Sequence, residues 1–266
     1  MTASLLAGLL RDLAEEGREL DELVAGLPEG AWTTPTPAAG WTVAHQIAHL
    51  AWTDEVAAGA VREPARFRAE RDAAPDLATS VDDAAAQGAA APPAELLDRW
   101  RTARAALATA LADLPSGTAI PWFGPDMSAA SMATARLMET WAHGVDVRDT
   151  LGRDTPATLR LRAVAHLGVR TRDFAFRQRG EPVPEHEFRV ELTGPGGEVW
   201  TWGPAEADQR VQGPALDFCL RVTRRRHRAD LALRADGPDA DRWLDIAQAF
   251  AGPPGTDRPA TAAPHS

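Results

Sequence analysis

The first 152 residues contain four stretches with the spacing of amphipathic helices, and this constrains the fold more than any other feature of the chain. In the first stretch, Leu5, Leu9, Leu13 and Leu20 recur four or seven positions apart, so they share one face of a helix. The four stretches cover about residues 3–26, 42–59, 95–114 and 128–152. Four such helices bury their apolar faces against one another, which predicts a four-helix bundle.

The rest of the chain is predicted to form a smaller α+β domain over residues 153–251. Two segments with alternating apolar residues flank a glycine-rich turn at 194–197, a pattern typical of a β-hairpin. The predicted elements are helices over 158–176, 214–223 and 240–250 and strands over 188–192, 198–202 and 230–234. The fold class is therefore α+β, with a bundle first and the smaller domain second.

Two segments of the sequence are weakly patterned. Residues 64–92 are rich in Ala, Asp and Pro, and we expect one short helix between mobile parts that could overhang the bundle. Residues 252–266 are rich in Pro, Ala and Thr, and we expect a disordered tail.

Several kinds of chemistry are excluded by residues that the sequence lacks. It contains no Lys, Asn or Tyr, so all 28 basic residues are Arg. Without Lys there is no Schiff-base enzyme and no phosphate-loop lysine, and without Asn there is no Cys-His-Asn protease. The single cysteine, Cys219, excludes an intrachain disulfide and a multi-cysteine zinc site, and we expect it to be a buried apolar residue.

Charge and hydropathy bear on partners and location. The formal net charge of −10 disfavours nucleic acid, whose phosphates attract cations. Nowhere do the roughly 18 apolar residues of a membrane span follow one another, and the N-terminus lacks the basic leader of a signal peptide. We therefore expect a cytoplasmic protein without membrane association that acts on a small molecule. Its oligomeric state stays open.

Two histidines and a glutamate on the predicted helices have the pattern of a metal site. Glu139 and His143 stand four positions apart, so both side chains leave one face of a helix with about 3.6 residues per turn. His49 lies beside an apolar stripe on the second helix, which would turn it toward the bundle interior. Two nitrogens and a carboxylate oxygen are the donors of a catalytic zinc that keeps one position open. The alternative is three unrelated polar side chains.

His45 stands four positions before His49 and is a further candidate. The sequence thus offers three or four protein ligands, and a structural zinc site has four whereas a catalytic one is left open. We favour His49 as the ligand and His45 as a neighbour, either supporting the site or lying on the helix surface.

Three motifs in the first domain resemble the DinB-like bundles and, among them, the mycothiol-dependent maleylpyruvate isomerase group of actinobacteria. They are GWTVAHQIAHL at residues 40–50, PWFGP at 121–125 and ETWAHGVDVRD at 139–149. The resemblance covers about residues 1–152, and the second domain is only loosely similar to that of the group. It implies that His49, Glu139 and His143 bind a divalent metal ion, often zinc.

The resemblance also implies an enzyme that uses mycothiol or another low-molecular-weight thiol for isomerisation or S-transfer on a small electrophilic substrate. A metal-bound thiolate is a nucleophile at neutral pH. The same ion without a thiol would activate water, so a metal-dependent hydrolase is the second hypothesis. A non-catalytic metal-binding protein is the third, because one scaffold can host several functions.

Weaker candidates surround the three predicted ligands. Asp146 could orient an imidazole or lie on the helix surface, and Arg148 and Arg153 could bind a carboxylate or form surface ion pairs. The basic run 224–228 is expected to be a solvated helix end. One or two of four tryptophans are expected to contact a ligand, with Trp122 the candidate for the cofactor pocket: Trp41, Trp52, Trp122 and Trp141.

Overall fold

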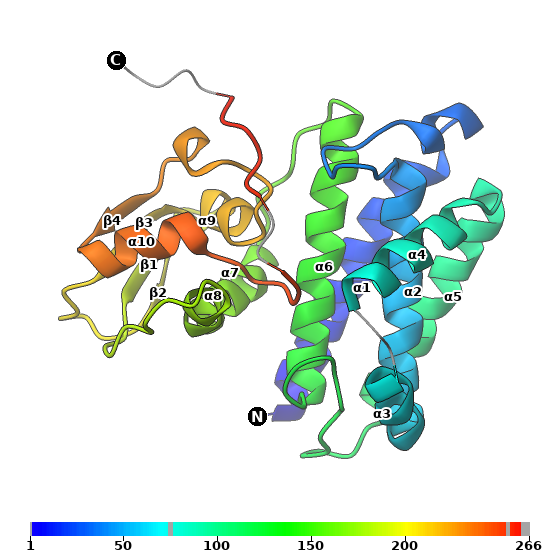
Figure 1. Ribbon diagram of the computed structural model, residues 1–266, viewed down its shortest axis with the longest axis horizontal. Helices are drawn as coiled ribbons and strands as arrows, with labels where there is room; N and C mark the ends of the chain where they lie inside the picture. Colours follow the sequence, from blue (N-terminus) through cyan, green and yellow to red (C-terminus); the bar gives the residue numbers. More distant parts are fainter. Residues whose placement is uncertain (1, 74–76, 254–255, 262–266) are drawn as a thin grey trace. The chain divides into compact units, whose positions relative to one another are not determined.

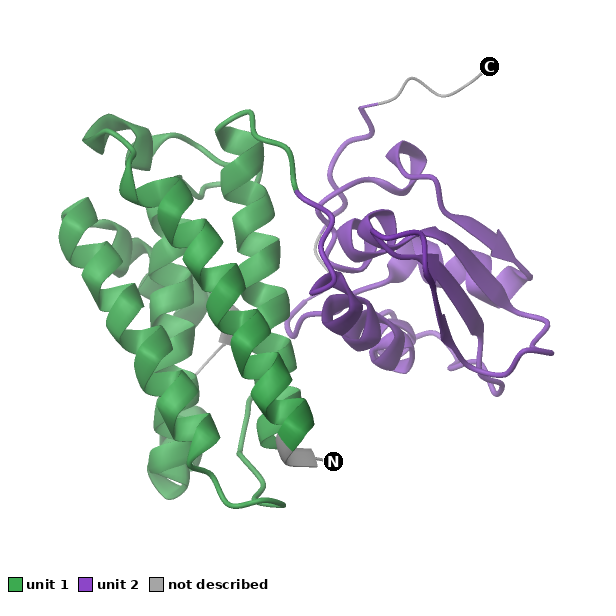
Figure 2. Cartoon of the chain, turned by 180° about the vertical axis from the view of Figure 1, so that it is seen from behind, with its two compact units in different colours: residues 1–155 green, residues 156–266 purple. Residues whose placement is uncertain are grey.

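The computed structural model describes residues 2–73, 77–253 and 256–261. The chain divides into two compact units, residues 1–155 and 156–266 (Figures 1 and 2). Our sequence-based boundary, after residue 152, falls three positions before the end of unit 1. None of the helices in the described part of the chain has both the length and the apolar character of a bilayer-spanning helix.

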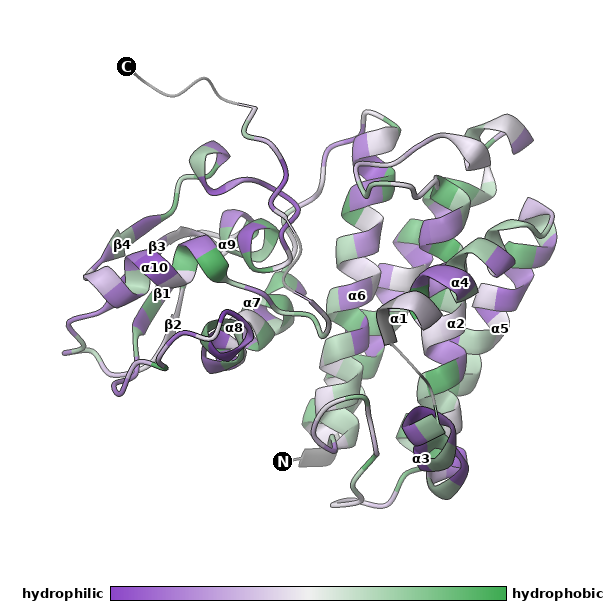
Figure 3. Ribbon diagram, viewed as in Figure 1, coloured by the Kyte–Doolittle hydropathy of each residue, from purple (hydrophilic) through white to green (hydrophobic). Residues whose placement is uncertain are grey.

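Unit 1 is a helical bundle, as predicted. Its four long helices are α1 (Thr2–Ala25), α2 (Val43–Arg62), α5 (Pro93–Ala112) and α6 (Ala129–Thr150). Figure 3 shows polar and apolar residues alternating around these helices, as expected for amphipathic helices that cover a shared core. The 3₁₀ turn Glu29–Thr33 and two shorter helices complete the unit.

The two helices that matter for the site begin at capping residues. At the start of α2, the Thr42 backbone N–H donates to Nδ1 of His45 at 3.3 Å. At the start of α6, the Ser131 backbone N–H donates to Oγ of Ser128 at 3.1 Å. Such caps satisfy backbone donors that have no partner within the helix, so the predicted starts at 42 and 128 are confirmed.

The segment 64–92 differs from our expectation of one short helix. It contains two helices, α3 (Pro64–Ala73) and α4 (Leu77–Ala89). The contact of α4 with α2 is made by very small residues, so that a Cβ atom added at Gly88 would lie 2.7 Å from Cβ of Ala48. Alanine and glycine give almost no hydropathy pattern, which is why the sequence did not reveal this packing.

Two apolar clusters fill the bundle, and a polar layer lies between them. The first contains Ile47 and Val147, and the second contains Ala57 and Met132. On α6 the polar residues at 136, 139 and 143 fall between Met132 and Val147. Burying polar groups costs free energy unless they have partners, so this layer is the part of unit 1 that packing alone does not explain.

Unit 2 is α+β, as predicted. Its sheet contains β1 (Arg189–Thr193), β2 (Val199–Trp202), β3 (Arg210–Pro214) and β4 (Arg234–Asp236), in the order β2-β1-β3-β4. The pair β1–β2 is the expected antiparallel hairpin, β1–β3 is parallel and β3–β4 is antiparallel. Trp243 packs edge-on against Phe188 and Phe218. The helices are α7 (Leu161–Arg170), α8 (Arg172–Gln178), α9 (Ala215–Val222) and α10 (Pro238–Ile246).

Two predicted elements of unit 2 are corrected, and one strand was missed. The single helix over 158–176 is two helices, which meet at Thr171, where its hydroxyl donates to the Leu167 and Gly168 carbonyls. The strand expected at 230–234 lies at 234–236, after a 3₁₀ turn at 228–230. The strand β3 was not predicted, because it contains Gly213 and Pro214, which are unusual within strands. Glycine is needed at 213, since a Cβ atom there would lie 2.6 Å from the Ala232 carbonyl oxygen.

The expected disordered tail, 252–266, is described only at 252–253 and 256–261, and its other residues lie outside the described part of the chain. Within 256–261 the Asp257 carboxylate forms ion pairs with Arg221 and Arg224. This part of the tail is therefore held against unit 2, contrary to our expectation. The run 224–228 is also corrected at its first residue, since Arg224 is buried at 8% exposure.

Candidate metal centre

His49, Glu139 and His143 converge between α2 and α6. One ligand atom from each lies within 4.8 Å of the others. Oε2 of Glu139 is 3.5 Å from Nε2 of His49 and 3.2 Å from Nε2 of His143. The helix spacing that placed Glu139 and His143 on one face thus brings them to His49, 90 positions or more away in sequence.

The cluster is buried but open to solvent on one side. The side chains of His49 and His143 are 9% and 10% exposed, whereas that of Glu139 is 21% exposed. Burial alone would raise the pKa of Glu139, but the imidazoles of His143 and His49 outweigh it and hold that pKa well below its ordinary value. The carboxylate is therefore an anion at neutral pH that a cation can reach.

The ring of His143 is held by a residue that the sequence reasoning missed. Nδ1 of His143 lies 2.5 Å from Oε1 of Gln46, which is fully buried on α2. The Trp41 ring stacks on His143, with centroids 5.8 Å apart and an interplanar angle of 18°. Gln46 lies within the motif at residues 40–50 but is not one of the usual metal-ligand types, and only its position three residues before His49 indicated that it shares the His49 face.

His49 is held differently. Its ring centroid lies 5.3 Å from Trp41, 6.3 Å from Trp52 and 4.5 Å from His143. Its Nδ1 atom is buried, and among the described residues it has no hydrogen-bond partner. On the Nδ1 side, packing against rings rather than a hydrogen bond therefore sets the orientation of His49.

His45 does not join the cluster. Its Nδ1 lies 2.8 Å from the Thr42 hydroxyl at the start of α2, and burial lowers its pKa. The ring remains half-buried, 6.3 Å from Trp41 between centroids. Of the two positions we considered for His45, the structure favours a neighbour that caps the helix.

Asp146 and Arg148 are buried rather than on the surface. Asp146 is fully buried, so our helix-surface alternative is wrong, and its predicted contact with an imidazole stays a prediction. Arg148 is 6% exposed, and its Nη2 lies 3.7 Å from Oε2 of Glu19 on α1. Arg153 is exposed just beyond α6. A role for either arginine in binding a substrate or thiol carboxylate also stays a prediction.

The tryptophans divide into two groups. Trp41 and Trp52 flank His49, and Trp41 is tied to α4, since its Nε1 donates to Oδ1 of Asp82 at 3.1 Å. Trp122 instead stacks on Phe67 of α3 at 5.8 Å, within the second apolar cluster. Trp141 is buried. Trp41 and Trp52 are thus the tryptophans beside the three residues, and a pocket role for Trp122 stays a prediction.

A buried ion pair lies in the same polar layer and was also missed. Nε of Arg136 donates to Oδ1 of Asp54 at 2.9 Å, and both side chains are almost fully buried. Arg136 lies three residues before Glu139 on α6. The pair joins α2 to α6 one turn from the cluster, which fixes the separation of the two helices that carry the candidate ligands.

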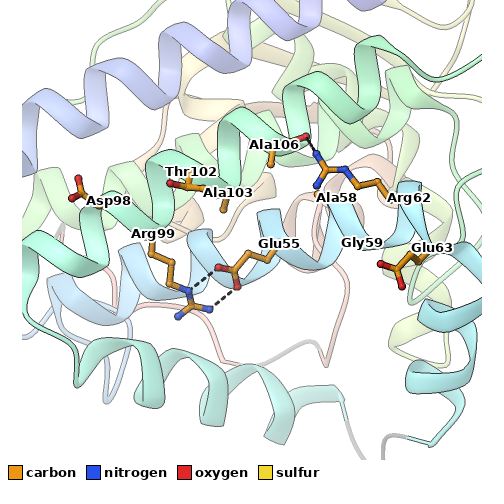
Figure 4. Close-up of a pocket in the computed structure, with 10 residues that line it drawn as sticks. All are labelled: Glu55, Ala58, Gly59, Arg62, Glu63, Asp98, Arg99, Thr102, Ala103 and Ala106. Carbon is orange, nitrogen blue, oxygen red and sulfur yellow. Dashed lines mark hydrogen bonds and ion pairs between the residues drawn. The ribbon is translucent and has the colours of Figure 1, made fainter.

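A groove of unit 1 lies elsewhere. It has a volume of about 480 Å³ and runs between α2 and α5, with Glu55 and Arg99 paired across it (Figure 4). Ala58 lines it nine positions after His49, two and a half helical turns, so the groove is on the opposite face of α2. None of the residues that line it is one of the three candidate ligands.

Comparison with known proteins agrees with this architecture. Residues 13–148, slightly more than half of the chain, match the family described as the mycothiol maleylpyruvate isomerase N-terminal domain. Residues 184–236 match a second model, described as wyosine base formation. Two uncharacterized proteins of Mycobacterium tuberculosis, from two strains, are 58% identical over 248 residues, covering 93% of this chain and 96% of theirs.

Solved structures show the same fold at low sequence identity. The mycothiol-dependent maleylpyruvate isomerase and a histidine-to-alanine variant of it superpose with TM-scores of 0.60 and 0.59. Each is 16% identical and covers 88% of this chain and 95% of its own. A helical bundle followed by a small α+β unit is therefore the fold that this chain shares with these structures. The chain belongs to the mycothiol maleylpyruvate isomerase N-terminal domain family.

Proposed function

We propose that His49, Glu139 and His143 bind one divalent metal ion and that zinc is the ion that fits best. Zinc ligands at about 2.0–2.2 Å in a tetrahedron lie about 3.4 Å from one another. The two separations from the Glu139 oxygen, 3.5 and 3.2 Å, agree with that value. This convergence of two imidazoles and a carboxylate is the observation that carries the proposal.

We further propose that the metal site is catalytic rather than structural, so that the protein is an enzyme. Three protein ligands leave a position open, whereas structural zinc sites have four. The obvious fourth ligand, His45, is engaged with Thr42 instead. The partial exposure of Glu139 provides access from solvent.

The bound molecule that best fits this position is a low-molecular-weight thiol. The solved relatives are mycothiol-dependent isomerases by name, and the family supports the same use here. When bound, the metal would stabilise the thiolate form of such a thiol at neutral pH. The thiol has to come from outside the chain, since Cys219 is fully buried in unit 2 and burial raises its pKa.

The reaction that we propose is isomerisation or S-transfer on a small electrophilic substrate, with mycothiol as the first thiol to test. The residues of the chain contribute orientation: Gln46 and Trp41 hold His143, and Trp41 and Trp52 hold His49. Hydrolysis by a metal-activated water remains the competing reaction, because it needs the same three ligands.

The test combines metal analysis with a thiol-dependence assay. Purified protein is expected to contain about one zinc per chain, and His49→Ala and His143→Ala variants almost none. His227→Ala is the matched control, because His227 is a surface histidine of unit 2 whose ring caps a 3₁₀ turn. Unchanged zinc content in the first two variants would refute the metal site.

Cobalt substitution then tests the thiol. Adding mycothiol to the cobalt-loaded protein is expected to produce a sulfur-to-cobalt charge-transfer band, with glutathione and dithiothreitol as comparison thiols. Turnover of electrophilic substrates that requires a thiol supports isomerisation or S-transfer. Turnover that proceeds equally without any thiol would favour the hydrolase instead.

A further inference from the structure

Gln46 is buried between the candidate metal centre and a rigid loop that precedes α2. Its Nε2 donates to Oγ1 of Thr36 at 2.8 Å, and its Oε1 lies against Nδ1 of His143. The Thr36 hydroxyl in turn donates to the Trp41 carbonyl at 3.0 Å. A continuous chain of hydrogen bonds therefore runs from the loop to the imidazole.

Which atom donates and which accepts in each of these hydrogen bonds follows from the bond at the Trp41 carbonyl. The Thr36 hydroxyl has one hydrogen, and the Trp41 carbonyl accepts it, so the hydroxyl oxygen can only accept from Gln46. The amide nitrogen of Gln46 consequently faces Thr36, and the amide oxygen faces His143. An amide oxygen has no hydrogen, so Nδ1 of His143 must donate to it.

The loop itself is well braced. The backbone N–H of Thr36 donates to the Trp41 carbonyl at 2.7 Å, and that of Val43 donates to the Thr34 carbonyl at 3.2 Å. Gly40 turns the loop at φ 79°, in the left-handed region that favours glycine. The same loop carries Trp41, which stacks on His143. One loop thus positions this imidazole both by stacking and through Gln46.

We propose that Gln46 is the positioning residue that holds His143 in the tautomer with the proton on Nδ1 and the lone pair of Nε2 directed at the metal. This inference rests on the proposed metal site. In that tautomer the lone pair of Nε2 and the Glu139 oxygen are two acceptors 3.2 Å apart. For a neutral ring, a cation between them makes this arrangement favourable, so the orientation set by Gln46 prepares the centre for a metal ion.

Gln46 makes the centre asymmetric. His49 has no corresponding hydrogen bond to Nδ1 among the described residues, and its ring is held by packing. An outer partner that orients a metal-binding histidine contributes about 10- to 100-fold to metal affinity. We therefore assign that contribution to the His143 side of the site.

The first experiment measures zinc affinity of the full-length protein by competition with a chelating dye. Gln46→Leu is expected to bind zinc about 10- to 100-fold more weakly than the wild type. Gln46→Glu keeps an acceptor against Nδ1 and is expected to restore most of the affinity. Thr36→Val removes the hydroxyl that accepts from the Gln46 amide, so that this amide can rotate. The expected loss of zinc affinity is smaller than for Gln46→Leu.

Gln248→Leu is the matched control. Gln248 is similarly buried, at 2% exposure in unit 2, and its amide nitrogen donates to two backbone carbonyls. It is expected to bind zinc like the wild type even if the loss of a buried glutamine lowers its melting temperature. A Gln46→Leu protein that binds zinc within about twofold of the wild type would overturn the inference, given the 10-fold minimum expected.

A second measurement reads the tautomer directly. In ¹⁵N spectra of the histidines, with His143→Ala for assignment, the neutral His143 ring is expected to carry its proton on Nδ1 in the wild type and to shift toward Nε2 in Gln46→Leu. This result is read in the metal-free protein, so it decides the role of Gln46 even if the wild type binds no zinc. A proton on Nε2 in the wild type would contradict the inference, whereas failure to bind zinc would count only against the proposed function.

Discussion

Each unit buries a carboxylate between two nitrogen-bearing side chains, but the partners differ. In unit 1, Glu139 faces two imidazoles. In unit 2, Asp257 faces two guanidinium groups, with Nη1 of Arg221 at 3.1 Å and Nη2 of Arg224 at 2.7 Å from Oδ1. Arginine is always charged, so the cluster in unit 2 is complete as it stands. An imidazole can instead bind a metal ion through a nitrogen lone pair, so the cluster in unit 1 can hold a cation.

Because their partners differ, we interpret the cluster in unit 2 as structural and the cluster in unit 1 as a candidate functional site. The guanidinium of Arg221 also donates to the Leu244 and Asp245 carbonyls, so most of its donors are used within the protein. In the polar layer of unit 1, Arg136 likewise pairs with a buried carboxylate, that of Asp54, although its Nη2 atom has no hydrogen-bond partner among the described residues. Burial of charge is therefore not by itself a sign of function here. The convergence of three side chains that could hold a metal ion is the better sign.

The largest expected effect comes from removing the carboxylate of unit 1. Glu139→Gln is expected to lower zinc affinity by more than about 100-fold, beyond the range of outer partners, because a neutral amide does not attract the ion. The melting temperature without metal is expected to change little, since glutamine has the same shape and can donate to an imidazole. Calorimetric zinc titration and thermal unfolding measure the two quantities.

The opposite result for Glu139→Gln would weaken the distinction between the clusters of unit 1 and unit 2. A Glu139→Gln protein that keeps its zinc but unfolds several degrees earlier would mean that the cluster of unit 1 is structural like that of unit 2. Zinc content is the deciding observation, because stability alone does not distinguish the two.

Local periodicity explains what the sequence could predict. Glu139 and His143 share a face because they are four positions apart on α6, and the apolar stripe of α2 turns His49 inward. These arguments need only the helix repeat. Gln46 was missed because its partner His143 lies 97 positions away and a glutamine alone indicates no particular partner.

Long-range pairing explains what the sequence could not predict. The strand β3 is defined by its neighbours β1 and β4, and its own Gly213 and Pro214 argue against a strand. Asp257 lies in a segment whose composition indicates disorder, and only its contacts with Arg221 and Arg224 reveal otherwise. In both cases the deciding interaction is with residues that no local window contains.

The next-largest effect is expected from breaking the ion pairs that Asp257 forms in unit 2. Asp257→Asn is expected to destabilise unit 2 by about 2–3 kcal/mol, below the roughly 3–5 kcal/mol of a fully buried pair because Asp257 keeps some exposure. Arg224 adds to the cost, since its φ of 60° is unfavourable for a residue with a side chain and Asp257 helps to hold it. Urea unfolding measures the loss, and zinc binding should not change.

Asp245→Asn provides the control for this prediction. Asp245 pairs with Arg228 at 2.7 Å, but its side chain is 46% exposed, and exposed pairs contribute less than about 1 kcal/mol. Equal destabilisation by the two substitutions would mean that the buried arginines do not depend on Asp257.

The smallest expected effect is the pH dependence of the same ion pairs. Burial raises the pKa of Asp257, but Arg221 and Arg224 outweigh it and lower that pKa below its ordinary value. A carboxylate with a lowered pKa in the folded state stabilises fully above its unfolded pKa, about 3.9 for Asp. The difference in unfolding free energy between wild type and Asp257→Asn should therefore stay constant from neutral pH to about pH 5 and narrow as the pH falls further. Protonated Asp257 resembles the asparagine, so the two curves converge. Urea titrations at a series of pH values test this, and a gap that instead widens toward acid pH would show that Asp257 is not the anion that closes the cluster.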